Sequence, residues 1–178
     1  MTEFSNDHIR IAGIDDVPAI IALLNKAYRG DASKKGWTTE ANLIAGNQRT
    51  NKDEVTALIH SSVFLIYTDA AIIEGCVNLQ QHDNKIYLGM LSVNPELQGS
   101  GIGKKLLQAS EEYALSKGCN SIYMTVIDVR EELIHWYKRH GYADTGERKP
   151  FEEDGISGKH LQKLQFMVLE KEGFSDVS

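Results

Sequence analysis

The stretch of the chain that most limits its fold runs from residue 86 to residue 118. Residues 86–93 read Ile-Tyr-Leu-Gly-Met-Leu-Ser-Val, an apolar run typical of a central strand that is covered on both faces. Three glycines follow at alternate positions, and from Ile102 the apolar residues recur every three or four positions, as in a helix. A buried strand, a glycine-rich loop and a helix in succession indicate a layered α/β fold.

The remaining pattern extends this interpretation to a mixed α/β sandwich. We expect strands at residues 8–12, 63–67, 72–79, 86–93, 121–127, 142–145 and 163–170. We expect helices at residues 17–28, 39–48, 53–60, 102–117 and 131–140. No Pro/Gly/Ser-rich linker divides the chain. The sequence therefore predicts one domain over residues 8–171 and a disordered tail over residues 172–178.

Charge and hydropathy exclude several classes of partner. Nineteen Lys and Arg against 25 Asp and Glu give a formal net charge of −6, and such a surface repels nucleic acid and anionic membranes. No apolar run approaches the roughly 18 residues that span a bilayer. The N-terminus carries acidic residues where a targeting peptide carries basic ones. We therefore expect a cytoplasmic protein with no nucleic-acid and no membrane partner.

The two cysteines, Cys76 and Cys119, are too few for a disulfide framework, and no histidine lies at metal-ligand spacing from either of them. We expect both to be small buried hydrophobic residues and expect no metal site.

The glycine-rich loop has the properties of a phosphate-binding loop. Glycines at 99, 101 and 103 remove every Cβ from one side of it, so its N–H groups can approach an anion beside a helix N-terminus. Two common phosphate motifs do not fit. The triphosphate P-loop needs Gly where Gln98 stands and Ser or Thr where Lys105 stands, and the dinucleotide fingerprint needs Gly where Lys104 stands.

The pattern that fits is Gln98-x-x-Gly101-x-Gly103. It resembles the pyrophosphate-binding loop, Arg/Gln-x-x-Gly-x-Gly/Ala, of the GCN5-related N-acetyltransferase (GNAT) superfamily. About thirty residues later, Trp136-Tyr137-x-x-x-Gly141-Tyr142 is similar to the superfamily's second signature, an aromatic-Tyr-x-x-x-Gly-aromatic segment. The order of elements also matches the superfamily over nearly the whole chain.

The resemblance implies a fold and a co-substrate. The fold is a single-domain, GNAT-like, mixed and mostly antiparallel twisted sheet flanked by helices, with a splayed central strand pair. The co-substrate is acetyl-coenzyme A (acetyl-CoA), with its pantetheine on the backbone of Leu91 and Val93 and Ser92 between them. The pyrophosphate is expected on the N–H groups of Gln98, Gly99, Ser100, Gly101, Ile102, Gly103 and Lys104. Arg130 stands where many members carry Asn near the pantetheine, and could instead clamp a coenzyme A phosphate or an acidic acceptor.

The resemblance also implies direct attack of a neutral amine on the thioester in a ternary complex. By analogy, the backbone N–H of Leu91 stabilises the oxyanion, and Tyr137 is the acid that protonates the departing thiolate. The base is open, because residues 86–93 contain no carboxylate. Glu40 is the first substitute and Asp128 the second; a relay through water and the absence of a dedicated base are further alternatives.

The sequence thus predicts an acetyl-CoA-dependent N-acetyltransferase acting on a primary amine of a small molecule or peptide. The alternative is a non-catalytic acyl-CoA sensor on the same fold, favoured by the missing carboxylate and disfavoured by Tyr137. The pattern does not identify the acceptor. It also leaves a homodimer open, since dimers are common in the superfamily.

Overall fold

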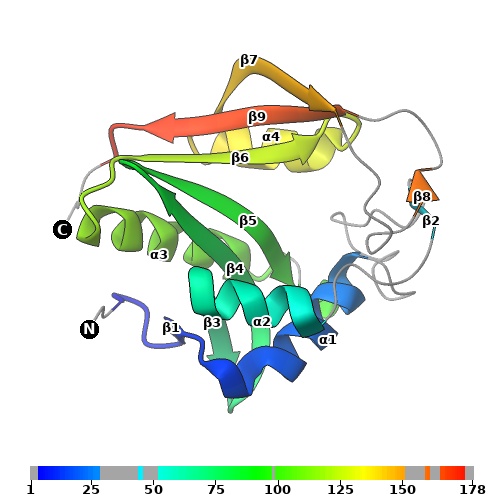
Figure 1. The fold of residues 1–178 in the computed structure, drawn as a ribbon, viewed down its shortest axis with the longest axis vertical. Coiled ribbons are helices and arrows are strands. Elements are labelled where there is room, and N and C mark those ends of the chain that lie inside the picture. Colours follow the sequence, from blue (N-terminus) through cyan, green and yellow to red (C-terminus); the bar gives the residue numbers. More distant parts are fainter. Residues whose placement is uncertain are drawn as a thin grey trace.

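The computed structural model of the chain is a sheet with helices on both faces, and it describes residues 4–28, 44–45, 52–97, 99–150, 159–160 and 165–174 (Figure 1). The strands are β1 (Ile9–Ile11), β2 (Ile44–Ala45), β3 (Val63–Asp69), β4 (Ile72–His82), β5 (Lys85–Val93), β6 (Ser121–Ile127), β7 (Ala143–Pro150), β8 (Lys159–His160) and β9 (Gln165–Glu172). The helices are α1 (Val17–Tyr28), α2 (Lys52–Ser61), α3 (Ile102–Ser116) and α4 (Glu131–Arg139), with short 3₁₀ turns at Ile14–Asp16 and Pro95–Leu97.

Seven strands form the main sheet, in the order β1-β3-β4-β5-β6-β9-β7. All neighbouring strands are antiparallel except β5 and β6, which are parallel. Helices α1 and α2 cover one face beside β3 and β4, whereas α3 and α4 lie on the other (Figure 1). The mixed, mostly antiparallel sheet flanked by helices that the sequence predicts is therefore confirmed.

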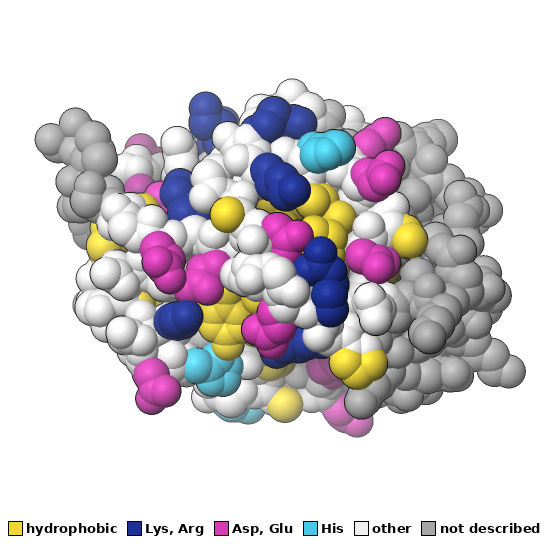
Figure 2. Space-filling view, turned by 90° about the horizontal axis from the view of Figure 1, so that it is seen from above, with side chains coloured by type: hydrophobic (Ala, Val, Ile, Leu, Met, Phe, Trp, Pro, Cys, Tyr) yellow, Lys and Arg dark blue, Asp and Glu magenta, His cyan; other side chains and the backbone are white. Residues whose placement is uncertain are grey.

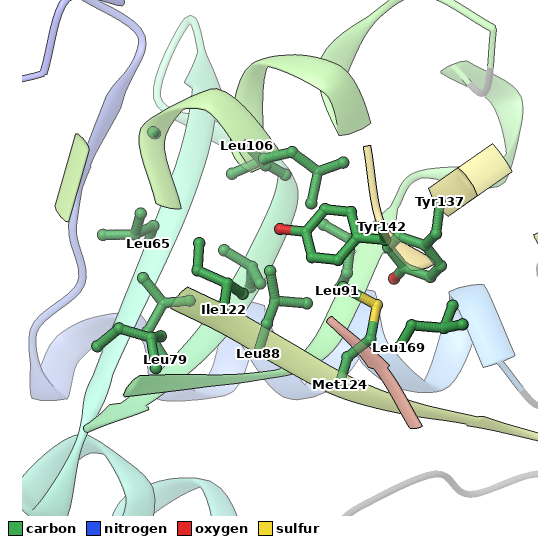
Figure 3. Close-up of a cluster of buried hydrophobic side chains, with 14 of the residues drawn as sticks. Leu65, Leu79, Leu88, Leu91, Leu106, Ile122, Met124, Tyr137, Tyr142 and Leu169 are labelled. Carbon is green, nitrogen blue, oxygen red and sulfur yellow. The ribbon is translucent and has the colours of Figure 1, made fainter. Parts of the chain in front are cut away.

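Alternation along the strands divides the buried side chains between the two faces. On β3, Leu65 belongs to the larger core, which also contains Leu106 of α3. Its neighbours Phe64 and Ile66 belong to the smaller core beneath α1 and α2. The larger core also holds Tyr137, on the inner face of α4 (Figure 3). Helix α3, which follows the glycine-rich loop, and helix α4, which carries Tyr137, thus pack on the same side of the sheet.

Strands β5 and β6 separate soon after they meet. Their backbones pair only at Lys85 with Ser121, at Ile86 with Ile122 and at Tyr87 with Tyr123, although β5 continues to Val93. A side-chain hydrogen bond of 3.1 Å joins Tyr87 Oη to Thr125 Oγ1 just past the last pair. The predicted splayed central strand pair is confirmed.

The helix expected over residues 39–48 is wrong at the two positions that the structure describes there. Ile44 and Ala45 form β2, which pairs antiparallel with His160 and Lys159 of β8. A short apolar run fits a helix and a strand equally well, and here pairing with a distant segment decides between them.

The outer strand β7 is longer than the expected 142–145, and all eight of its residues are exposed. It carries none of the apolar alternation that would mark it as a strand in the sequence. Figure 2 shows Lys or Arg and Asp or Glu side chains interspersed on the face seen from above Figure 1. Strand β7 itself carries two ion pairs, Asp144 with Arg148 and Glu147 with Lys149. Charge of both signs on an edge strand opposes edge-to-edge association.

Among the described residues, no helix has the length and apolar character needed to cross a membrane. Both cysteines are buried, as expected.

The close approach of α3 to β4 depends on Gly75. A Cβ at this position would lie 2.9 Å from Ile102 Cγ2 and 2.9 Å from Leu106 Cδ1. We expect Gly75→Val to lower the free energy of unfolding by about 1–3 kcal/mol through overpacking, as measured by urea denaturation. Gly13→Val is the matched control, because a Cβ at Gly13 meets nothing within 4 Å. Equal unfolding free energies for the two variants would contradict this account of the helix position.

Candidate active site

The loop between β5 and α3 turns through two glycines in the left-handed region of backbone conformation. Gly99 has a φ of 91° and Gly101 a φ of 90°, which other residues adopt at a cost. Gly101 is the N-cap of α3, and its carbonyl accepts the first helical hydrogen bond from Lys105 N at 3.1 Å. The amides of the first helical turn have no acceptor within a helix. The start of α3 therefore offers N–H groups and the positive end of the helix dipole to an anion.

Gly103 admits an aromatic side chain from α4 to the start of α3. A Cβ on Gly103 would lie 3.1 Å from Trp136 Cζ2, tighter than ordinary packing. His140 lies against the same indole, with ring centroids 4.4 Å apart, and its Nδ1 is 2.7 Å from the Trp136 carbonyl oxygen. Trp136 thus joins the two helices and forms a wall beside the loop.

An outer cavity of about 580 Å³ lies between the start of α3, the end of β5 and one face of α4. The described residues that line it are Leu91, Ser92, Val93, Gly99, Gly101, Ile102, Gly103, Lys104, Glu132, Leu133, His135, Trp136, Tyr137, Arg139 and His140. Most of the predicted cofactor residues therefore surround one cavity. Ser100 is exposed beside it, and Gln98 lies outside the described residues.

A smaller inner cavity, of about 130 Å³, occupies the gap between the splayed strands. Its lining comprises Tyr87, Leu88, Gly89, Met90, Leu91, Met124, Thr125, Val126, Ile127, Arg130, Leu133, Tyr137 and Phe166. The two cavities share Leu91, Leu133 and Tyr137. They are therefore neighbours, and Leu91 of β5 and Tyr137 of α4 stand where they meet.

Strand β5 is bulged at this meeting point. Ser92 pairs with Cys76 and Gly89 with Asn78, so Met90 and Leu91 stand opposite the single residue between them on β4. Met90 has a φ of 55°, a conformation that is unusual for a residue with a side chain. Bulges change the direction of the residues around them and are frequent beside active sites. Leu91 is buried here, with 8% of its surface exposed.

Tyr137 is held on two sides by aromatic rings. Its ring meets Trp136 edge-on with centroids 5.2 Å apart, and meets Tyr142 edge-on at 5.8 Å. Figure 3 shows Tyr137 and Tyr142 adjacent, with Leu91 among the residues around them. The side chain is 5% exposed yet lines both cavities. Packing thus fixes the orientation of the Tyr137 ring where the two cavities meet.

Cys76 lies next to the bulge, and its Sγ donates a hydrogen bond of 3.7 Å to the Met90 carbonyl. Burial raises the pKa of Cys76 to about 12. A thiolate is the reactive form of cysteine, so Cys76 is a poor nucleophile at neutral pH.

Of the two candidate bases, the structure describes only Asp128, and this residue lines neither cavity. Asp128 is partly exposed at the end of β6, where its N–H donates to the Gln165 carbonyl at 2.8 Å, and it lines neither cavity. Glu40 lies outside the described residues. None of the described residues that line the inner cavity is Asp or Glu. Arg130, the N-cap of α4, lines the inner cavity and is 8% exposed.

Sequence reasoning missed the basic side of the outer cavity. His135, Arg139 and His140 all line it from α4. Their spacing with Glu132 and Trp136 follows the three-to-four-residue period of one helix face. That period would have identified them once Tyr137 had been assigned to the same helix.

Comparison with known proteins agrees with this arrangement. The model of the acetyltransferase (GNAT) family matches residues 19–142. Among curated relatives, thialysine N-epsilon-acetyltransferase of Sus scrofa is 33% identical over 79 residues, which are 44% of this chain and 46% of that protein. Streptothricin acetyltransferase of Streptomyces lavendulae is 27% identical over 70 residues, 39% of this chain and 37% of that protein. These matches thus span less than half the length of either relative.

A solved structure with a similar fold is the PaiA N-acetyltransferase of Thermoplasma acidophilum in complex with coenzyme A. It has a TM-score of 0.65 and 20% identity, and the match covers 93% of this chain and 98% of that one. An N-acetyltransferase of Staphylococcus aureus Mu50 gives a TM-score of 0.68 at 17% identity, covering 94% and 99%. The splayed strands, the glycine-rich start of α3 and the match over residues 19–142 lead to one conclusion: the chain belongs to the GNAT family of acetyltransferases.

Proposed function

We propose that this protein transfers the acetyl group of acetyl-CoA to a primary amine of a small molecule or peptide. The observation that carries the proposal is the meeting of two cavities at Leu91 and Tyr137. The outer one begins at an anion-binding helix start, and the inner one lies in the gap between β5 and β6. A thioester at the meeting point would have its carrier on one side and space for a second reactant on the other.

The lining of the outer cavity suits the pyrophosphate and the pantetheine arm of coenzyme A. The N–H groups at the start of α3 would receive the pyrophosphate, with Lys104 and Arg139 adding positive charge. The amide-bearing pantetheine arm would run along the edge of β5 at Leu91, Ser92 and Val93, because an extended amide chain pairs with a strand edge. These assignments are those that the family resemblance implies, and the groups that line the cavity support them.

The chain's own groups at the meeting point would serve the transfer. The amine attacks the thioester carbon with its lone pair, and the N–H of Leu91 donates to the oxyanion of the tetrahedral intermediate. When the carbon–sulfur bond breaks, the Tyr137 hydroxyl gives its proton to the thiolate. The proton that the new amide nitrogen sheds passes to solvent, from which Tyr137 is reprotonated. Glu40 and Asp128 stay predictions for the group that removes this proton.

Direct transfer is favoured over a covalent acyl-enzyme. Cys76 is the thiol next to the bulge, and its raised pKa disfavours the thiolate that would have to take the acetyl group. The amine therefore attacks the thioester itself, with both reactants bound.

A non-catalytic acyl-CoA sensor is the second candidate, favoured by the lack of a carboxylate among the described residues lining the inner cavity. Thiol release from acetyl-CoA across a panel of primary amines distinguishes the two. We expect release that depends on the amine and saturates with it. Tight binding of acetyl-CoA without amine-dependent release would instead support the sensor.

The role of Tyr137 as an acid is tested by Tyr137→Phe, which keeps the ring and removes the hydroxyl. We expect kcat to fall at least tenfold, while the Kd for acetyl-CoA, measured by calorimetry, changes less than threefold. Tyr142→Phe is the matched control: Tyr142 is buried, lines neither cavity, and its hydroxyl has no hydrogen-bond partner among the described residues. Wild-type turnover in Tyr137→Phe would show that the thiolate leaves without a proton from Tyr137.

The phosphate-binding role of the loop is tested by Gly101→Glu, which places a carboxylate at the start of α3. We expect the affinity for acetyl-CoA to fall at least 100-fold, because the new charge faces the bound pyrophosphate. Gly118→Glu carries the same charge and the same left-handed strain to the other end of α3, where φ is 76° and a Cβ meets nothing within 4 Å. If both variants lost affinity equally, strain in α3 rather than the phosphate site would be responsible.

A further inference from the structure

Arg130 occupies a place that the phosphates of coenzyme A do not explain. It is buried, with 8% of its surface exposed, and it lines the inner cavity but not the outer one. Its backbone is held at the start of α4, since its N–H donates to the Ile127 carbonyl and its carbonyl accepts from Ile134 N–H, each at 3.0 Å. The residue is therefore a built part of the cavity between the strands.

The helical spacing of residues on α4 sets the order in which they line the two cavities. Arg130, Leu133 and Tyr137 are spaced by three and then four residues, so they follow one another along one helix face. Leu133 and Tyr137 line both cavities, whereas Arg130 lines the inner one alone. About two helical turns, roughly 10 Å along the axis, separate Arg130 from Tyr137. Arg130 thus belongs to the side of the meeting point opposite the start of α3.

Of the two roles that the sequence leaves open for Arg130, this placement favours contact with the acceptor. A phosphate clamp would have to lie in the outer cavity beside Lys104, and Arg130 is not among the residues there. A guanidinium in a small cavity binds a carboxylate through two parallel hydrogen bonds. The same charge repels an acceptor whose only ionised group is an ammonium.

We propose that the acceptor is an amino acid or a similar amine that carries a carboxylate, and that Arg130 binds this carboxylate. The proposal rests on the proposed acetyl transfer and names its substrate class. The carboxylate enters the inner cavity and pairs with the guanidinium, while the amine of the same molecule is directed toward the thioester at Leu91 and Tyr137. Arg130 is thereby a specificity-determining residue.

The test compares acceptors that differ by the carboxylate alone. Lysine is paired with cadaverine, and β-alanine with ethylamine, in thiol-release assays with acetyl-CoA. In any pair of which at least one acceptor is acetylated, we expect kcat/KM to be at least tenfold higher for the acceptor that carries the carboxylate. Arg130→Gln should bring the two members within threefold of each other, and Arg130→Lys, which keeps the charge without the planar fork, should retain part of the preference. Equal kcat/KM in the wild type, or a preference unchanged in Arg130→Gln, would overturn the proposal.

A second arm examines the acyl donor as the source of the carboxylate. Succinyl-CoA and acetyl-CoA are compared with ethylamine as acceptor, in the wild type and in Arg130→Gln. A preference for succinyl-CoA that disappears in the variant would assign Arg130 to the acyl group and overturn its assignment to the acceptor. Equal or poorer use of succinyl-CoA supports the acceptor assignment.

A binding measurement separates failure of this inference from failure of the proposed transfer. N-acetyl-β-alanine and N-ethylacetamide are titrated into the coenzyme A-loaded protein by calorimetry, with Arg130→Gln as the comparison. If N-acetyl-β-alanine binds, N-ethylacetamide does not, and Arg130→Gln abolishes the binding, the role of Arg130 is supported even if no amine is acetylated. The lack of acetylation would then reject only the proposed transferase activity. Failure of N-acetyl-β-alanine to bind the wild type more tightly than N-ethylacetamide contradicts the role of Arg130 and leaves the transferase standing. Thermal unfolding of both Arg130 variants shows whether they are folded.

Discussion

The site depends on the loss of backbone pairing between β5 and β6 beyond Tyr87 and Tyr123. A continuous sheet would leave no gap at this point and no strand edge to offer a ligand. Because β5 keeps its partner β4 on the other side, the strand stays fixed while its other edge turns toward the cavity. The side-chain hydrogen bond between Tyr87 and Thr125 joins the two strands just past their last backbone pair, and both residues line the inner cavity.

Three glycines bring α3 to this gap, each for a different physical reason. Gly75 lets the helix approach β4 closely, since a Cβ there would meet Ile102 and Leu106 at 2.9 Å. Gly101 supplies the left-handed conformation that begins the helix, and Gly103 leaves space for Trp136 from α4. The position of the start of α3 is therefore a property of packing as much as of the loop itself.

Most elements could be predicted from local pattern, and the errors have physical causes. β6 matches its expected bounds because an apolar run there ends cleanly at polar residues, and the sequence placed α4 to within one residue because Gly141 follows it. Residues 44–45 were misjudged because their conformation is decided by pairing with β8, more than a hundred residues away. β7 was placed too short because a fully exposed edge strand has no buried face to leave a signature.

The parts of the site that could be predicted from the sequence are likewise those that belong to local patterns. The glycine-rich loop and Tyr137 belong to local motifs, so their spacing was enough to single them out. The placement of Arg130 depends on the angle at which β6 leaves β5 and carries the start of α4 with it, which no local pattern encodes. A phosphate partner would require the Arg130 side chain in the outer cavity, and an acidic acceptor would require it in the inner one. Only the fold shows which cavity the residue lines.

The positive charges of the two cavities would face different parts of the reactants. In the proposed complex, coenzyme A would bring its charge to the outer cavity, where Lys104, Arg139 and the start of α3 would meet it. Beyond Tyr137, a simple primary amine with a pKa near 10.4 would be protonated in all but about one molecule in 2,500 at pH 7. In a zwitterionic acceptor the carboxylate itself stabilises the ammonium. In the proposed complex, engagement of that carboxylate by Arg130 would remove this stabilisation where the amine must become neutral. Substrate recognition and deprotonation would then be linked through one buried cation, in a cavity whose described lining contains no carboxylate.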